Sequence, residues 1–174
     1  MALCLLLARW CRAHGHRLVA MTVDHGLRVS GLQAAARSAR FALLTDRAAS
    51  LGARGLFLAH HVQDQAETMV MRLARGSGPD GLAGIRSRQM RDGIPVLRPL
   101  LPVPPGSLRA HCLAEGQVWV EDPSNRDRRF ERVRVRQQGK GMTDAGLDAA
   151  RLNRLAQAFG RLRDWSEIRL ADFL

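Results

Sequence analysis

Apolar residues in the first half of the chain recur at spacings that alternate between helical and extended patterns. Residues 1–13 have near-helical spacing, and Gly15 in "HGH" suits the end of a helix. Residues 17–24, "RLVAMTVD", form a short apolar run that is typical of a buried parallel strand. Residues 32–51 follow a helical pattern, and residues 54–60 predict a second strand. The order strand, helix, strand predicts a right-handed βαβ unit.

The second half of the chain alternates helical patterns with turn signals. We expect a helix that begins after His61 and runs through about Arg75, where "GSGPDG" stops it, and a hairpin around Asp92-Gly93. Three more helices are expected: a short one near 108–115, an Arg-rich one after "DPSN" that reaches residue 136, and an amphipathic one over 144–164.

Composition narrows the class of protein. A chain of 174 residues suits one domain of ordinary size and can bury a core without disulfides. It is 46% hydrophobic, yet no apolar run approaches the ~18 residues of a membrane span, and "MALCLLLARW" lacks the basic flank of a secretory signal. The cysteines, Cys4, Cys11 and Cys112, form no CxxC pair. We therefore expect a cytoplasmic protein that is not embedded in a membrane.

The net charge of +11 indicates a polyanionic partner, because clustered arginines attract phosphates and release their counterions. Lys140 is the only lysine, so an arginine-rich coding bias remains an alternative explanation. The helix that follows "DPSN" carries much of this charge. Its plain interpretation is a solvated helix partly paired with Asp127 and Glu131, and an RNA-facing role gains weight only from the charge of the whole chain.

Polar groups follow both predicted strands, where ligands bind in an open α/β sheet. Helical spacing puts His61, Asp64 and Thr68 on one stripe, with Glu67 beside it, so the two carboxylates could face one ligand or cation. The alternative is that these acids complement the helix dipole while His61 caps or packs. Magnesium is an easier metal than zinc here, because it takes one or two carboxylates plus phosphate oxygens.

The glycine-rich turn after this helix offers a second chemical signal. Gly76, Gly78 and Gly81 permit a tight turn whose amides could approach a phosphate, although a GxG alone is weak evidence. Arg72 and Arg75 would by default belong to a solvated helix face.

The segments "VDHGLR", "LQAAARSARF", "LAHHVQDQAETMVMRLARGSGPDGLAGI" and "WVEDPSNRDRRFERVRVR" together resemble the catalytic domain of bacterial tRNA(Ile)-lysidine synthases. The resemblance implies an α/β fold with a parallel sheet flanked by helices, the adenine-nucleotide alpha hydrolase-like or PP-loop class. We expect this domain over 1–136 and a small helical segment over 137–174. In that family ATP adenylates the carbon-2 oxygen of the wobble cytidine of tRNA(Ile), and free L-lysine then displaces AMP.

The resemblance also implies roles for individual residues. Asp64, Glu67 and Arg37 match catalytic positions, and Asp64 is the expected Mg²⁺ ligand. The remaining assignments fall into two sets. ATP contacts are expected at Asp24, His25, His61, Gly76 and Gly78, and contacts to tRNA or lysine at Arg28, Arg40, Arg72, Arg75 and Arg132.

The chain departs from the family pattern in two places. The SGGxDS-type phosphate loop that precedes the first helix in the family is absent from the sequence. Only Val29 and Ser30 separate "VDHGLR" from "GLQAAAR", where the family has roughly thirty more residues. If these 174 residues are the whole polypeptide, we expect ATP activation to be very weak or lost, because the loop amides cradle the pyrophosphate of ATP.

Two other functions stay open. A non-catalytic tRNA-binding remnant would bind RNA with steep salt dependence and without a response to ATP. A PP-loop tRNA thiolase is the minor alternative, because thiolases with an iron–sulfur cluster need clustered cysteines. The sequence does not decide between a monomer and a homodimer.

Overall fold

The computed structural model describes residues 1–23, 33–120 and 123–172. The chain divides into two compact units. The first, the sheet unit, comprises residues 1–58 and 87–99, and the second, the helical unit, comprises residues 59–86 and 100–174. The structure does not fix how the two units are placed relative to each other, so each is described by itself.

The sheet unit contains a small mixed sheet in the order β1-β3-β2. Strand β1 (Leu56–Phe57) pairs in parallel with β3 (Ile94–Leu97), which pairs antiparallel with β2 (Arg88–Arg91). Between β2 and β3, Asp92 and Gly93 have φ of 50° and 75°, the left-handed conformation of both central residues of a type I′ turn. The predicted hairpin is therefore confirmed.

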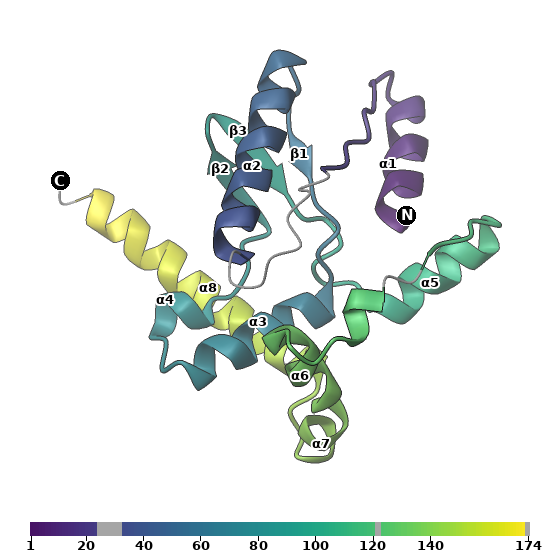
Figure 1. Cartoon of the computed structure of the whole chain (residues 1–174). Helices are drawn as coiled ribbons and strands as arrows, with labels where there is room; N and C mark the ends of the chain where they lie inside the picture. The colour runs from purple at the N-terminus through teal and green to yellow at the C-terminus, as the bar shows by residue number, and fades with distance from the viewer. Residues whose placement is uncertain (24–32, 121–122, 173–174) are drawn as a thin grey trace. The chain divides into compact units, whose positions relative to one another are not determined.

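One long helix covers this sheet. Helix α2 (Gln33–Ser50) packs against β1 and β3 (Figure 1). Phe41 and Ala48 of the helix join Leu56, Ile94 and Val96 of the strands in one apolar cluster. Beyond this cluster, the guanidinium of Arg91 stacks 4.5 Å from the centroid of the Phe41 ring.

The first segment of the sheet unit partly departs from expectation. Helix α1 (Ala2–Ala13) forms as predicted, and Gly15 follows it with φ of 66°. Residues 17–23 are not assigned to a strand, so the predicted strand over 17–24 is wrong in the part that the structure describes. A strand needs hydrogen bonds from a neighbouring strand, and no such partner is present among the described residues. The predicted βαβ unit is thus reduced to its helix and second strand.

The helical unit is built around α3 (Val62–Ala74), which contacts α4 (Pro79–Leu82), α6 (Glu131–Gln137) and α8 (Ala149–Ala171). Its apolar cluster consists of Ala66 and Met69 from α3 with Leu152 and Ala156 from α8. The remaining elements are α5 (Pro105–Ala114), the 3-10 helix η1 (Pro123–Arg126) and α7 (Gly139–Asp144). No described helix is both long and apolar enough to span a bilayer.

Two predicted helices of this unit have different bounds from those expected. The Arg-rich helix is divided into η1 and α6, with Asp127 accepting hydrogen bonds from Arg129 between them. The amphipathic helix begins only at Ala149, because Asp148 caps it by accepting from the backbone N–H of Arg151. The predicted domain boundary at residue 136 lies inside the helical unit, which includes all of residues 100–174. This boundary stays a prediction.

Candidate functional site

The carboxylate of Glu67 lies at the centre of the candidate site. Helix α3 turns it toward α6, where its side chain has no exposed surface. Arg136 donates to both of its oxygens, with Nε 2.7 Å from Oε1 and Nη2 3.2 Å from Oε2. Arg132 adds a third contact, with Nε 3.2 Å from Oε2. Burying a carboxylate is costly unless it is paired and hydrogen-bonded, and here two guanidinium groups meet that need.

Arg132 connects the polar residues of α3. Besides Glu67, its Nη2 donates to Thr68 Oγ1 at 3.0 Å, and its Nη1 lies 3.8 Å from Asp64 Oδ1. The side chain is still 33% exposed. Among the arginines assigned to substrate that the structure describes, Arg132 alone contacts the predicted acidic pair. We name Asp64, Glu67, Thr68, Arg132 and Arg136 the acid–arginine cluster.

Asp64 also shapes the start of α3. Its Oδ2 accepts from the backbone N–H of His61 at 2.9 Å, which satisfies the N-cap amide. The His61 Nδ1 atom lies 3.4 Å from the same oxygen. The capping alternative for these residues is therefore realised, and it coexists with the contact between Asp64 and Arg132. One carboxylate oxygen caps the helix while the other faces the arginine.

The glycine-rich turn is held by side chains of α3. Arg72 donates to the carbonyls of Gly81 and Gly84 at 2.6 and 3.1 Å. Gln65 accepts from the N–H of Ile85 at 2.7 Å and donates to its carbonyl at 3.3 Å. Arg72 is thus engaged within the fold rather than in a solvated face, and burial followed by repulsion from Arg163 lowers its pKa.

Three other predicted residues lie near this turn. Arg75 pairs with Glu131 of α6. Gly76 has φ of 68° after α3, and Gly78 is the N-cap of α4. Their geometry explains the sharp exit from α3, and their nucleotide contacts stay a prediction.

The predicted residues of the sheet unit are less fully described. Asp24, His25 and Arg28 lie outside the described residues. Arg37 lies on α2 without a described side chain, and Arg40 is exposed on the same helix. The roles of these five residues therefore stay predictions.

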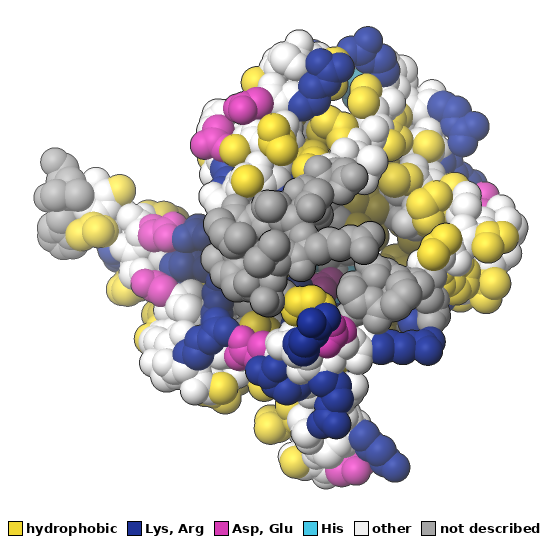
Figure 2. Space-filling model, in the orientation of Figure 1, with side chains coloured by type: hydrophobic (Ala, Val, Ile, Leu, Met, Phe, Trp, Pro, Cys, Tyr) yellow, Lys and Arg dark blue, Asp and Glu magenta, His cyan; other side chains and the backbone are white. Residues whose placement is uncertain are grey.

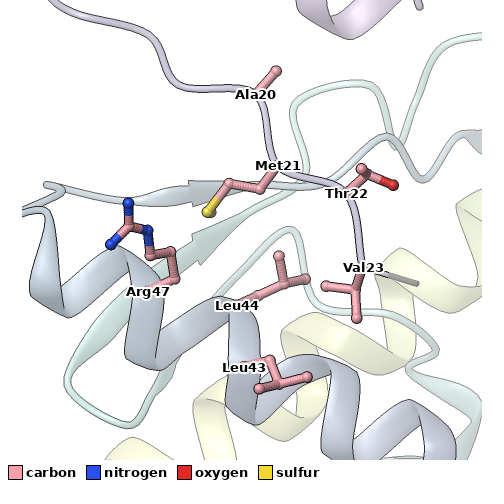
Figure 3. Close-up of a pocket in the computed structure, with 7 residues that line it drawn as sticks. All are labelled: Ala20, Met21, Thr22, Val23, Leu43, Leu44 and Arg47. Atoms are coloured by element: carbon pink, nitrogen blue, oxygen red, sulfur yellow. The ribbon is translucent and has the colours of Figure 1, made fainter. Parts of the chain in front are cut away.

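The sheet unit also contains a pocket of about 480 Å³ between residues 20–23 and α2 (Figure 3). Apolar side chains of Met21, Val23 and Leu44 line it together with polar groups, among them the guanidinium of Arg47. The pocket is lined by residues of the segment that precedes Asp24 in the sequence.

The donor set of the acid–arginine cluster fits only part of a magnesium site. Glu67 has both oxygens bound by guanidinium groups, so in this arrangement it offers no oxygen to a cation. Asp64 keeps Oδ1, 3.8 Å from Arg132 and without a closer described partner. Within the described ranges no three His, Cys, Asp or Glu side chains gather as a metal site. One carboxylate together with phosphate oxygens is a donor set that Mg²⁺ accepts.

Sequence reasoning did not single out Arg136 as a site residue. Arg136 contacts Glu67, which lies 69 positions away in the sequence. The hydrogen bond to this carboxylate is the main cause that raises the pKa of Arg136, whereas burial acts to lower it. The spacing of the charged residues carries a signal for this contact. Arg132 and Arg136 are four apart on α6, and Asp64 and Glu67 are three apart on α3, so each pair can present one face to the other.

Comparison with known proteins shows the family to which this chain belongs. Residues 28–139 match the family model of the PP-loop domain, an ATP-binding family, and the chain belongs to this family. The U34-tRNA thiolase NcsA from Methanococcus maripaludis, solved with its 4Fe-4S cluster, has a similar fold. Its TM-score is 0.59 at 14% identity, over 90% of this chain and 54% of that one, so it supports the fold alone.

Closer relatives share one name. The chain is 39% identical to the tRNA(Ile)-lysidine synthase of Ruegeria pomeroyi, over 94% of this chain and 47% of that protein. It is 46% identical to that of Methylobacterium nodulans, over 84% and 42%, and 40% identical to that of Rhodopseudomonas palustris, over 90% and 55%. The chain thus spans about half the length of these curated relatives.

The alignment with the Ruegeria protein also bears on the shortened segment. It runs over 199 positions, more than the 174 residues of the chain. The relative therefore carries residues within the aligned region that this chain lacks, and their placement after Arg28 stays a prediction.

Proposed function

We propose that this chain carries the acid–arginine part of the catalytic domain of a tRNA(Ile)-lysidine synthase. The supporting observation is the cluster of Asp64, Glu67, Arg132 and Arg136 in a PP-loop family member whose relatives bear that enzyme name. The proposed reaction joins free L-lysine to the wobble cytidine of tRNA(Ile), driven by ATP. The proposed place of work is the bacterial cytoplasm, where tRNA and lysine are both available.

The geometry supports distinct roles for the two carboxylates. Asp64 has one oxygen free of close described partners, so it is the proposed contact for the incoming ammonium of lysine or for Mg²⁺. Glu67 has no such oxygen and acts through the arginines, which makes it a positioning residue. By binding Glu67, Arg136 helps to fix the carboxylate against which Arg132 rests.

Arg132 is the proposed electrophilic group. Its guanidinium is fixed by Glu67 and Thr68 and is partly exposed, so it can stabilise negative charge that develops on a phosphate during adenylation. A guanidinium held in place before the reaction needs little reorganisation in the transition state, and this is the main advantage of a preorganised site. When bound, Mg²⁺ would supply further positive charge toward the leaving pyrophosphate.

The test places this segment in a complete host. Residues 61–137 replace the matching residues of the Ruegeria relative, and transfer of labelled lysine to a tRNA(Ile) transcript is measured. We expect transfer that depends on ATP and is absent from a transcript with uridine at the wobble position. A folded hybrid that binds ATP and tRNA yet transfers no lysine would contradict the proposal.

A second candidate is a tRNA-binding remnant without nucleotide chemistry. It is favoured by the engagement of both Glu67 oxygens, which is the arrangement of a structural ion pair. The 174-residue chain itself distinguishes the two candidates in a binding assay with labelled tRNA. A change in tRNA affinity on adding ATP supports the enzyme, and equal affinity with and without ATP supports the remnant.

A further inference from the structure

The arginines of the helical unit differ in what they already bind. Arg72 holds two backbone carbonyls, Arg75 pairs with Glu131, and Arg132 and Arg136 hold Glu67. These side chains stabilise the fold, and a new ligand would have to compete with those contacts. Arg72 and Arg75, which the sequence assigned to substrate, are therefore poorly placed for first contact with tRNA.

A different group of arginines lies at the exposed corner between η1 and α6. We name Arg126, Arg128 and Arg134 the basic corner, and all three are exposed. Within the described part of the chain, no acidic side chain is recorded against Arg128 or Arg134. Figure 2 shows Lys and Arg side chains gathered on the part of the surface over α6 and α7. From 126 to 140 the sequence carries seven cations and two carboxylates.

Arg134 gives this corner a fixed shape. Its Nη1 donates to the carbonyls of Arg128 and Arg129, each at 3.0 Å, so α6 and the preceding turn are joined by one guanidinium. The guanidinium has further N–H donors that no described group uses. The backbone of Arg128 is consequently held beside Arg134. A guanidinium that is fixed before binding, as that of Arg134 is, loses less freedom on binding an anion than an unrestrained side chain.

The chemistry of the corner fits nucleic acid better than a membrane. A membrane-binding helix needs large apolar side chains next to its cations, to enter the acyl region. Among the described residues, no large hydrophobic side chain between 123 and 146 is strongly exposed, and Val133 of α6 is buried. Cations without an apolar partner suit a phosphate backbone, which is contacted through charge and hydrogen bonds alone.

We propose that the basic corner binds the phosphate backbone of an RNA strand. The inference rests on the proposed function for the kind of RNA, a tRNA, and adds the surface on which that tRNA lies. It shifts the RNA contact from Arg72 and Arg75 to residues on either side of the start of α6.

The test measures binding without ATP or lysine, so that it is independent of the ligase reaction. A fluorescent RNA stem–loop with a cytidine at the wobble position is titrated with the full chain at several salt concentrations. The variant R126Q/R128Q/R134Q is compared with R17Q/R54Q/R88Q, which removes the same charge from exposed arginines of the sheet unit.

We expect the corner variant to reduce the slope of log affinity against log salt by about 2, and affinity by on the order of 10- to 100-fold. The control variant should change affinity only slightly. Equal losses in both variants would overturn the proposal, because diffuse charge would then explain binding. Unchanged RNA affinity in the corner variant would overturn it as well. Binding of both variants to vesicles that contain phosphatidylserine is measured in parallel. If the corner variant lost affinity for these vesicles but not for RNA, the proposal would be overturned in favour of a membrane surface.

A single substitution protects the test against misfolding. R128Q removes a guanidinium with no contact recorded in the described chain, and it should reduce the slope by about 0.7 to 0.9 for one phosphate contact. No change in slope for this folded variant would overturn the proposal. If the corner variants weaken RNA binding while the hybrid enzyme transfers no lysine, the surface stands and the proposed reaction fails. If the hybrid enzyme transfers lysine while the corner variants bind RNA normally, the proposed reaction stands and the proposed surface fails.

Discussion

The sheet unit and the helical unit differ in what fills their interiors. In the sheet unit, Phe41, Leu56 and Val96 form an apolar cluster between one helix and a small sheet. In the helical unit, Met69 packs against Leu152 of α8 and lies on α3, the same helix that carries the buried carboxylate of Glu67. Burial of apolar surface explains the interior of the sheet unit. The interior of the helical unit also contains charged side chains, which burial of apolar surface does not require.

The difference bears on the proposed function. Assembling a buried ion pair costs about as much in desolvation as it returns, so it is a weak source of stability. Removing only one partner is nevertheless costly, because the other charge is left uncompensated. Under the proposed function, Glu67 and its two arginines are retained for the chemistry they position rather than for the stability they add. The predictions below separate these two kinds of interior.

The largest effect is expected from truncating the apolar core of the sheet unit. Phe41→Ala should lower the free energy of unfolding by about 3–5 kcal/mol, because it removes a buried ring and its contact with Arg91. Leu43→Ala, on the same helix but 57% exposed, should change it by about 0.5 kcal/mol or less. Urea unfolding followed by circular dichroism measures both. Similar losses for the two variants would contradict the assigned core.

A smaller loss is expected from the helical unit when one charge is removed. Glu67→Gln keeps the shape of the side chain but removes the counter-charge of Arg136 and leaves Arg132 with Asp64 alone, which should cost about 2–3 kcal/mol given the partial exposure of both arginines. Glu131→Gln, which breaks the exposed pair with Arg75, should cost less than about 1 kcal/mol. The same urea experiment compares them.

Replacing the whole buried group sharpens this point. In E67M/R132M/R136M the charges leave together, so most of the lost stability should return, because well-packed apolar residues can replace a buried ion pair at little cost. If the triple variant were much less stable than Glu67→Gln, the ion pairs would be a structural requirement and the contrast between the two interiors would fail.

Replacing a turn glycine should lower the free energy of unfolding by about 1 kcal/mol in either unit. Gly93 of the hairpin and Gly76 after α3 have φ of 75° and 68°, and a Cβ at either position would meet no atom within 4 Å. Alanine there should be destabilising through backbone strain alone. Gly78→Ala is the control, since its φ is −71° and its surroundings are open. A neutral result at Gly93 and Gly76 would contradict the assigned turns.

The smallest effect concerns pH. Hydrogen bonding to Arg86 holds the pKa of Glu167 below its ordinary value of 4.5. The stabilising contribution of this carboxylate is complete above its pKa in the unfolded chain and is lost as the pH falls through the lowered folded value. Nuclear magnetic resonance titration of the Glu167 carboxyl should show a higher midpoint in Arg86→Gln. Identical midpoints would show that the pair does not form in solution.

Local signals in the sequence predicted the elements that depend on neighbouring residues. The Asp92-Gly93 turn requires only positive φ at two positions, and α3 requires only an apolar stripe and a cap, so both were found. The strand expected over 17–24 depends on a partner from elsewhere in the chain, and periodicity alone does not supply that information. The length of β1 also depends on its partner strand. The pattern over residues 54–60 predicts a strand there, but only Leu56 and Phe57 form one.

The candidate site shows the same division. Helical spacing alone predicts that Asp64 and Glu67 lie close together on α3, because it depends only on residues within that helix. Spacing does not reveal that Arg136 binds both oxygens of Glu67, because that contact joins helices far apart in sequence and depends on how α6 packs on α3. The roles of Asp24, His25 and Arg28 concern residues outside the described ranges and stay predictions.

The central claim is that Asp64 serves lysine transfer through its charge rather than as a helix cap. The most direct measurement is the rate of lysine transfer to tRNA(Ile) by the hybrid enzyme carrying Asp64→Asn, because asparagine can still accept from the His61 amide. We expect a loss of on the order of 100-fold or more, with unchanged unfolding, whereas Glu131→Gln should stay within about twofold. An Asp64→Asn hybrid that transfers lysine at the unmodified rate would contradict the account.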